Sequence, residues 1–384
     1  MTKCLYLQNK CRHLGKGVTM PVSKTTSLDG YWKKKTIVSF MLSVFVLFIH
    51  MSSFAQPYPI EGSAYEGIIE CINVFFRKSF VLTAVPLFFI ISGATFFRDY
   101  KPSDYKKRLI SRAKSILIPY LIWNTVNTLF ELVISNTPIS NYFAGREIVE
   151  INIRNILTGI FFYTSYGPFW FIFNLMIFIA ITPLIYLIIS KKRIAIPVMA
   201  GLLVLQTFGI NLPEAMFFEA ESLVYYIFGA FIGKYCFDWF ASESSSKAHA
   251  LGGIGILAST AFFFAQGIKL FTLPDSVNAV VKIIASLSLW IVVDKLFRSI
   301  PVKNFMCDSF IVYATHDSLR SVFIKLFYLL FLKHPMMAVL NFFVASALTI
   351  ITICVFCAFM RKFFPRIFAV ISGSRVSKRA LKAN

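Results

Sequence analysis

The sequence predicts an all-α protein: a polytopic transmembrane helix bundle of about ten spans with both termini in the cytoplasm. The 384 residues are 57% hydrophobic and only 15% charged, and their mean hydropathy is +0.70. Soluble domains carry ~25% charged residues, so this composition excludes a soluble enzyme and a disordered chain. The apolar runs are continuous rather than alternating, which excludes a transmembrane β-barrel.

Ten apolar stretches approach the ~20 residues that a helix needs to cross a membrane. Polar or basic connectors separate them in order, among them residues 191–193, 211–214, 272–276 and 298–304. The predicted spans cover residues 36–55, 80–97, 115–135, 168–189, 194–210, 217–236, 251–271, 278–297, 309–332 and 336–360. The chain thus divides into a basic cytoplasmic tail (1–35), a transmembrane domain (36–360) and a second basic cytoplasmic tail (361–384).

The distribution of cations predicts the orientation. With the N-terminus inside, 30 of the 39 Lys and Arg residues fall on the cytoplasmic side and six on the other. Cytoplasmic loops of membrane proteins carry such an excess, so we attribute the net charge of +21 to topology rather than to nucleic-acid binding. The longest loop on the opposite side covers residues 136–167.

A signal peptide is the competing interpretation of the first apolar run. Lys33, Lys34 and Lys35 precede it, and residues 53–56 (Ser-Phe-Ala-Gln) resemble a cleavage site. The 35 residues before the run are long for the basic region of a signal peptide, which favours a retained span.

Ionisable residues inside apolar spans are costly and therefore mark candidate sites. His50 lies in the first span, within Val-Leu-Phe-Ile-His-Met. In the ninth span, Tyr313, His316 and Arg320 recur at helical spacing, with Asp317 beside them. This polar stripe predicts either a hydrogen-bonded seam between helices or the wall of a wet cavity.

A second candidate site is the run of seven cations in residues 98–114, which includes Arg108, Arg112 and Lys114. Arg and Lys bind phosphate esters well, but a pure topology signal explains the run equally well. No metal site is expected. Cys354 and Cys357 have CxxC spacing, but they lie one turn apart in an apolar helix with no further ligands, and we interpret them as packing residues.

Six short motifs together resemble the membrane-bound acyltransferase 3 family. In order, they are the first-span histidine, Phe88-Phe89-Ile90-Ile91-Ser92-Gly93, Arg108-x-x-x-Arg112 before Pro119-Tyr120, Gly167-Pro168-Phe169-Trp170-Phe171, Tyr225-Tyr226-Ile227-Phe228-Gly229, and Ser309-Phe310-Ile311-Val312-Tyr313-Ala314-Thr315-His316. The resemblance covers about residues 31–365. Family members often carry an Arg eleven residues before the histidine and another three residues after the position of Arg112. This chain has Ser39 and Ser115 there.

The resemblance implies transfer of an acyl group, most often acetyl, from cytoplasmic acyl-CoA to a hydroxyl of a cell-envelope or exported sugar. It makes His50 the leading catalytic candidate. A histidine can take the proton of a sugar hydroxyl as the thioester is attacked. His316 would orient reacting groups, and Arg320 or a cytoplasmic cation would stabilise the oxyanion.

The expected partners follow from this chemistry. The phosphates of the donor acyl-CoA would lie on Arg108, Arg112 and Lys114, and no cofactor is expected to be bound tightly. Trp170 and Tyr166 could stack on the sugar, although an interfacial aromatic belt also explains them. The resemblance implies the bilayer of the bacterial inner membrane, and no nucleic-acid partner is expected.

A polytopic transporter or flippase of a glycan intermediate or small metabolite is the alternative function. Buried charges such as His50, His316 and Arg320 would then line its path. The sequence shows no matching pair of Gly- or Pro-broken spans in its two halves, which favours the acyltransferase.

Overall fold

The computed structural model describes residues 22–55, 58–138, 149–207, 220–297 and 300–374. Within these ranges the regular structure is helical and contains no strand, which confirms the all-α prediction. The α-helices are α2 (Val22–His50), α3 (Glu66–Lys78), α4 (Ala84–Phe97), α5 (Tyr105–Arg112), α6 (Ile118–Ser135), α7 (Ile153–Phe162), α8 (Trp170–Ala180), α9 (Thr182–Ile189), α10 (Lys192–Thr207), α11 (Ala220–Tyr235), α12 (Phe237–Ala241), α13 (Ser246–Gly267), α14 (Asp275–Phe297), α15 (Ser309–Leu330), α16 (Met336–Phe363) and α17 (Pro365–Ile371).

Five helical segments in the described part of the chain are long and apolar enough to cross a membrane. They are Glu66–Phe97, Pro102–Ser135, Ser246–Gly267, Asp275–Phe297 and Met336–Phe363. The pair Ile153–Phe162 and Gly167–Ala180, bent by 48° at a short break, makes a sixth if it is one broken span. These segments contain or overlap six of the ten predicted spans, and the chain is a multi-pass membrane protein.

The other four predicted spans fall on α2, α10, α11 and α15. Helices α10 and α11 have 16 residues each, fewer than the ~20 that a perpendicular crossing needs. Helix α2 carries three consecutive lysines, and α15 carries Asp317, Arg320 and Lys325. The count of ten spans and the cytoplasmic position of both termini therefore stay predictions.

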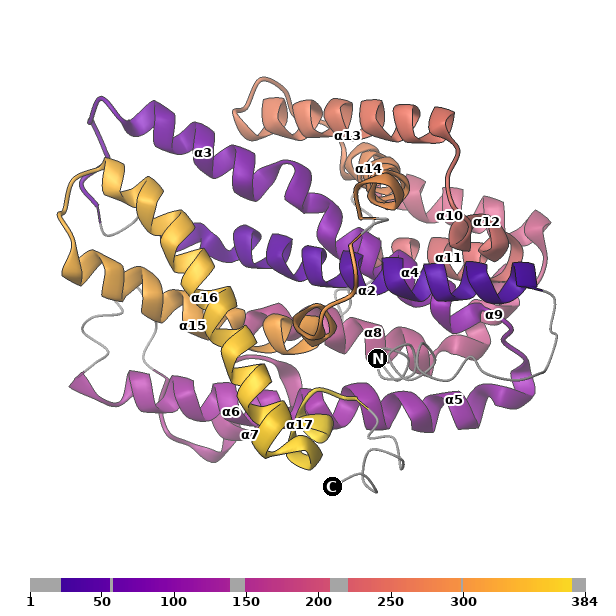
Figure 1. Cartoon of the computed structure of the whole chain (residues 1–384), viewed down its shortest axis with the longest axis horizontal. Helices are drawn as coiled ribbons and strands as arrows, with labels where there is room; N and C mark the ends of the chain where they lie inside the picture. Colours follow the sequence, from indigo (N-terminus) through magenta and orange to yellow (C-terminus); the bar gives the residue numbers. More distant parts are fainter. Residues whose placement is uncertain (1–21, 56–57, 139–148, 208–219, 298–299, 375–384) are drawn as a thin grey trace.

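Helix α2 runs through the middle of the bundle, with α3 on one side and α5 and α6 on the other (Figure 1). It begins at Val22, within the segment that we predicted as an N-terminal tail. Tyr31, Leu42 and Val46 are buried in the main hydrophobic core. The helix ends at His50 and continues as a short 3₁₀ turn, Met51–Ser53. Pro57 follows in the sequence, and proline cannot continue a helix.

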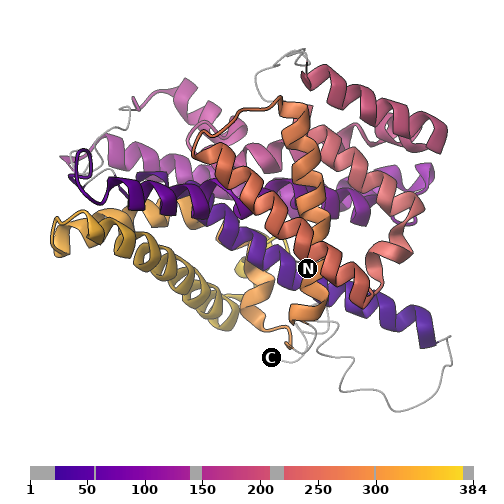
Figure 2. The same ribbon diagram turned by 90° about the horizontal axis from the view of Figure 1, so that it is seen from above.

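Helices α13 and α14 pack against each other, and in Figure 2 they cross in front of α2. The end of α14 reaches α2 itself, where Trp290 and Phe240 stack at 4.3 Å between ring centroids and lie beside Tyr31. These aromatic rings pack α12 and α14 against one side of α2.

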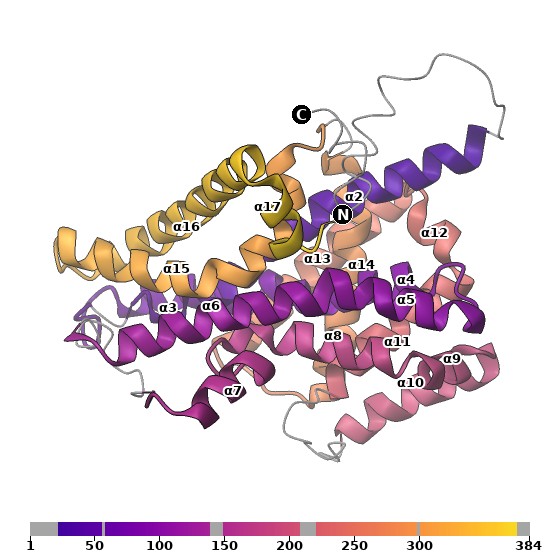
Figure 3. The same ribbon diagram turned by 90° about the horizontal axis from the view of Figure 1, so that it is seen from below.

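Small residues bring α4 and α11 into backbone contact (Figure 3). A Cβ atom at Gly93 of α4 would collide with the backbone of Tyr226 and Ala230. A Cβ at Gly229 of α11 would collide with the backbone of Ile90. Close approach through small residues is how transmembrane helices gain packing energy without a hydrophobic driving force.

The C-terminal segment also packs on the bundle. Helix α17 lies within the segment 361–384 that we predicted as a tail. The carbonyl oxygen of its last residue, Ile371, accepts a 2.9 Å hydrogen bond from the indole Nε1 of Trp123 on α6. Cys357 on α16 is buried and Cys354 half-buried, both as free thiols.

Candidate active site

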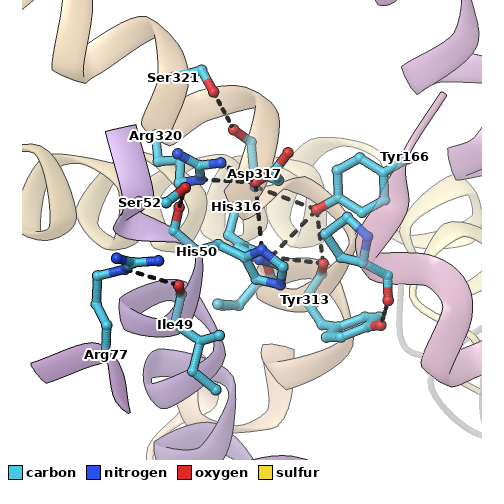
Figure 4. Close-up of polar contacts among 12 residues, drawn as sticks. Ile49, His50, Ser52, Arg77, Tyr166, Tyr313, His316, Asp317, Arg320 and Ser321 are labelled. Carbon is cyan, nitrogen blue, oxygen red and sulfur yellow. Dashed lines mark hydrogen bonds and ion pairs between the residues drawn. The ribbon is translucent and has the colours of Figure 1, made fainter. Parts of the chain in front are cut away.

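The structure brings His50 and His316 together from helices that are far apart in the sequence. The centroids of the two imidazole rings are 5.3 Å apart (Figure 4). Helices α2 and α15 lie side by side, and the hydroxyl of Ser43 on α2 donates a 3.1 Å hydrogen bond to the carbonyl of Ser309 on α15. The two histidines singled out in the sequence thus form one site.

His316 is fully buried, and its protonation state follows from its neighbours. Its Nδ1 lies 2.8 Å from the carbonyl oxygen of Tyr313. A carbonyl can only accept, so Nδ1 carries the proton. The buried Nε2 has no hydrogen-bond partner among the described residues. The lone pair of Nε2 therefore accepts no hydrogen bond from the described residues.

The hydroxyl of Tyr166 also contacts the imidazole of His316 and helps to fix its orientation. Its hydroxyl lies 3.3 Å from Nδ1 of His316 and donates a 3.0 Å hydrogen bond to the carbonyl of Tyr313. It also accepts a 3.3 Å hydrogen bond from the backbone N–H of Asp317. The hydroxyl of Tyr313 donates to the carbonyl of Pro168, which connects the 3₁₀ turn Gly167–Phe169 before α8 to α15.

Asp317 supplies the negative charge of the site. Its Oδ1 atom lies 2.6 Å from Nη2 of Arg320, one turn further along α15. The same oxygen lies 4.0 Å from Nδ1 of His50. That distance is too long for a hydrogen bond but short enough for charge attraction when the imidazole is protonated. Asp317 is adjacent to the predicted polar stripe in the sequence but was not among the predicted site residues.

Arg77 is a site residue that sequence reasoning missed. It lies on α3, and its Nε donates a 3.2 Å hydrogen bond to the carbonyl of Ile49, next to His50. It also donates to the side chain of Asn73. The last carbonyls of a helix lack intrahelical partners, so Arg77 satisfies one and fixes the end of α2. In the sequence Arg77 was only one of the six cations assigned to the outer side.

Exposure separates the two histidines chemically. The side chain of His50 is 31% exposed, whereas His316 is 0% exposed. A group that exchanges protons with a substrate must be reached by that substrate. His50 meets this condition, and the fully buried His316 does not.

The predicted cations lie toward the other end of α2 and differ in what they contact. The guanidinium of Arg108 donates hydrogen bonds to the carbonyls of Phe96, Arg98 and Asp99, which follow or end α4. Arg108 therefore caps a helix C-terminus. Lys114 is exposed and lies in a π-helical turn, Ala113–Leu117.

Arg112 lies near Lys35, which the sequence predicted only as part of the basic cytoplasmic tail. The charge of Arg112 acts on Lys35, whose Nζ donates a 3.2 Å hydrogen bond to the hydroxyl of Thr95. Burial, together with the Arg112 charge, lowers the pKa of Lys35 to about 7. Lys35 and His50 are 15 residues apart on one helix, which places them roughly 22 Å apart.

The two aromatic residues predicted to bind sugar lie in different environments. Tyr166 is 2% exposed, and its hydroxyl belongs to the histidine cluster. Trp170 is half-buried and packs against the rings of Phe89 and Phe171. Of the two, Trp170 has the exposed ring surface.

The chain belongs to the acyltransferase 3 family, because the family's model, described as an acyltransferase domain, matches residues 40–361. This confirms the resemblance predicted from the motifs. The chain is also similar to the succinoglycan biosynthesis protein ExoH of Rhizobium meliloti (strain 1021), at 26% identity over 150 residues. The match covers 38% of this chain and 40% of that protein. No solved structure matches the chain.

Proposed function

We propose that the protein transfers an acyl group from acyl-CoA to a hydroxyl of a cell-envelope or exported glycan. The observation that carries this proposal is the partly exposed imidazole of His50, held at the end of α2 beside the Asp317–Arg320 ion pair. Membership of an acyltransferase family gives the reaction class.

In the proposed mechanism, His50 removes the proton from the acceptor hydroxyl as its oxygen attacks the thioester carbonyl. The new C–O bond forms, the C–S bond breaks, and the proton passes from the imidazole to the departing thiolate of CoA. The carboxylate of Asp317 stabilises the imidazolium that forms in between. The oxyanion faces a cation, and Arg320 is the candidate on α15.

The donor site in this proposal lies at the other end of α2. Lys35 and Arg112 supply positive charge for the phosphates of CoA, with Lys114 at the surface. The distance of roughly 22 Å from Lys35 to His50 suits the extended pantetheine arm, which would lie along α2. A donor bound on the cytoplasmic side would thus reach an acceptor near the opposite side.

The acceptor class is inferred from the relative, whose printed name concerns succinoglycan biosynthesis. A polysaccharide or its lipid-linked precursor presents many hydroxyls, and the ring of Trp170 offers an apolar face for a sugar. We propose acetyl as the transferred group, in line with what the family resemblance most often implies.

The proposed setting is the bacterial inner membrane, with ten spans and both termini in the cytoplasm. Cysteine substitutions at the exposed residues Ser103 and Glu150 test this orientation. An impermeant maleimide added to intact cells should label the Glu150→Cys variant and not the Ser103→Cys variant. The labelling of the unsubstituted chain, which has cysteines of its own, is subtracted from both. Equal labelling of both positions would refute the layout.

The catalytic proposal is tested with His50→Ala and His50→Gln. Each should reduce acyl transfer by ~10²–10⁴, measured by mass spectrometry of envelope glycans as loss of one acetyl increment. Glutamine keeps a hydrogen-bonding side chain but cannot act as a base. Activity restored by His50→Gln, with the protein inserted at normal levels, would make His50 a structural residue. His316→Gln should cause only partial loss.

A further inference from the structure

The C-terminal hook, residues 365–374, packs beside the junction of α5 and α6 (Figure 1). It consists of α17 and the three residues that follow it. Trp123 on α6 donates its indole N–H to the carbonyl of Ile371 in the hook. Two residues further along the chain, Gly373 lies against the backbone of Ser115. The acyl transfer proposed above assigns no role to this segment.

The hook contacts a π-helical turn, Ala113–Leu117, which joins α5 to α6. Pro119 explains why the helix widens at this point. Proline has no N–H to donate to the carbonyl of Ser115, four residues earlier, and in a regular α-helix its ring would collide with that carbonyl. The N–H of Ile118 instead bonds to the carbonyl of Ala113, five residues earlier. The carbonyl of Ser115 is thus left without the donor that a regular helix would supply.

Gly373 fits against this carbonyl because it has no side chain. A Cβ atom at Gly373 would collide with the carbonyl oxygen of Ser115 and would lie 3.3 Å from Cγ of Pro119. The φ angle of Gly373 is +64°, in the left-handed region that favours glycine. A larger residue would therefore push the hook away from the π turn.

The π turn decides which helices Arg112 faces. Arg112 and Trp123 are eleven positions apart, about three turns, so they would share one face of a regular α-helix. The extra residue in the wide turn rotates α5 by about 100° relative to α6. Trp123 accordingly faces the hook, whereas the guanidinium carbon of Arg112 lies 5.9 Å from the centroid of the Phe96 ring on α4. The charge of Arg112 also acts on Lys35 of α2.

We propose that the hook is a positioning element of the donor site. By packing on the π turn, it keeps Arg112 directed toward α2 and α4, where the phosphates of CoA would bind. Gly373 and Trp123 are then positioning residues, which act through Arg112 and do not touch the donor. This proposal rests on the proposed role of Arg112 in donor binding.

Isothermal titration of the purified full chain with CoA tests the proposal without need of an acceptor. Arg112→Ala should weaken CoA binding about tenfold, as expected for one lost charged hydrogen bond, and Gly373→Ala should weaken it by up to the same factor. Gly62→Ala is the matched control. Gly62 also has a positive φ, +73°, but a Cβ there meets no atom within 4 Å. Gly62→Ala should bind CoA as the wild type does.

A double variant separates positioning from a general loss of stability. If the hook acts through Arg112, then Gly373→Ala/Arg112→Ala should bind CoA as Arg112→Ala does, to within about twofold. A hook that only stabilises the fold would give losses that multiply, and its effect on CoA binding would follow its effect on Tm.

Trp123→Phe is the milder variant and carries the test if Gly373→Ala fails to fold. It removes the hydrogen bond to Ile371 and leaves Gly373 in place. It should weaken CoA binding about threefold, the effect of one neutral hydrogen bond on the position of the hook.

The outcomes distinguish the two proposals. Unchanged CoA affinity in Arg112→Ala would remove Arg112 from the donor site, and the role of the hook with it. If Arg112→Ala weakens binding, three results would overturn the role of the hook alone: wild-type affinity in Gly373→Ala, equal losses in Gly373→Ala and Gly62→Ala, or multiplied losses in the double variant. Wild-type affinity in Trp123→Phe would do the same where Gly373→Ala does not fold.

Discussion

Nδ1 of His50 lies 4.0 Å from Oδ1 of Asp317, an oxygen that already pairs with Arg320 at 2.6 Å. The carboxylate thus lies between the guanidinium of Arg320 and the imidazole of His50. A proton gained by His50 during catalysis would be stabilised by a charge that needs no rearrangement.

Asp317→Asn should lower kcat by ~10²-fold, the lower end of what acid–base catalysis contributes, while the KM of each substrate changes by less than about threefold. The amide keeps the size of the carboxylate but cannot stabilise an imidazolium. Asp317→Glu should recover part of the rate. A rise in KM with unchanged kcat would show that Asp317 serves substrate binding instead.

Substitution of Arg108 should affect mainly stability and substitution of Arg112 mainly donor binding, although both residues belong to one sequence motif. Arg108→Ala should mainly destabilise the protein, because three backbone carbonyls lose their charged donor and such bonds contribute about 1.5–3 kcal/mol each. Arg112→Ala should raise the donor KM about tenfold with an unchanged acceptor KM. Thermal unfolding and steady-state kinetics of both variants distinguish these outcomes. If Arg108→Ala unfolds normally and raises only the donor KM, its assignment as a helix cap is wrong.

Lys35 should make donor binding depend on pH near neutrality. Its pKa of about 7 means that it carries its charge below that pH and loses it as the pH rises. The donor KM should therefore increase between pH 6 and pH 8. Lys35→Arg keeps its charge throughout this range and should flatten the profile. An identical slope in the wild type and in Lys35→Arg would exclude Lys35 from the donor site.

Gly93→Ala should destabilise the bundle, because the added methyl group meets the backbone of α11 rather than a side chain that can move. Overpacking of this kind costs ~1–3 kcal/mol. Gly253→Ala is the matched control, since a Cβ at Gly253 on α13 meets no atom within 4 Å. It should be neutral or stabilising by up to about 1 kcal/mol through helix propensity. Thermal unfolding in one detergent compares the two; a similar Tm for both would contradict the close packing of α4 and α11.

The candidate catalytic residues could be named from the sequence because ionisable groups are conspicuous in apolar helices. His50, His316 and Arg320 stood out in this way, and the structure places all three in one cluster. Arg77 could not be recognised, because a cation in a polar connector has the same appearance whether it binds water or the carbonyl of Ile49.

The number of spans was less predictable than their presence. Hydropathy adds up over a local window, so it detects an apolar helix wherever one occurs. It does not report whether α10 or α15 lies against lipid or against other helices, because that depends on packing between distant segments. This is why five or six segments pass as spans and ten remain a prediction.

The sequence by itself determined that this chain is helical and membrane-embedded, because both properties depend on the composition of local segments. Its motifs also identified the acyltransferase family. Only the tertiary structure decided what each charge contacts. Lys34 and Lys35 are neighbours in the sequence, yet Lys34 pairs with Asp294 of α14 and Lys35 binds Thr95 of α4. Successive residues of a helix do not share a face, so their partners are set by the helices that pack on either side.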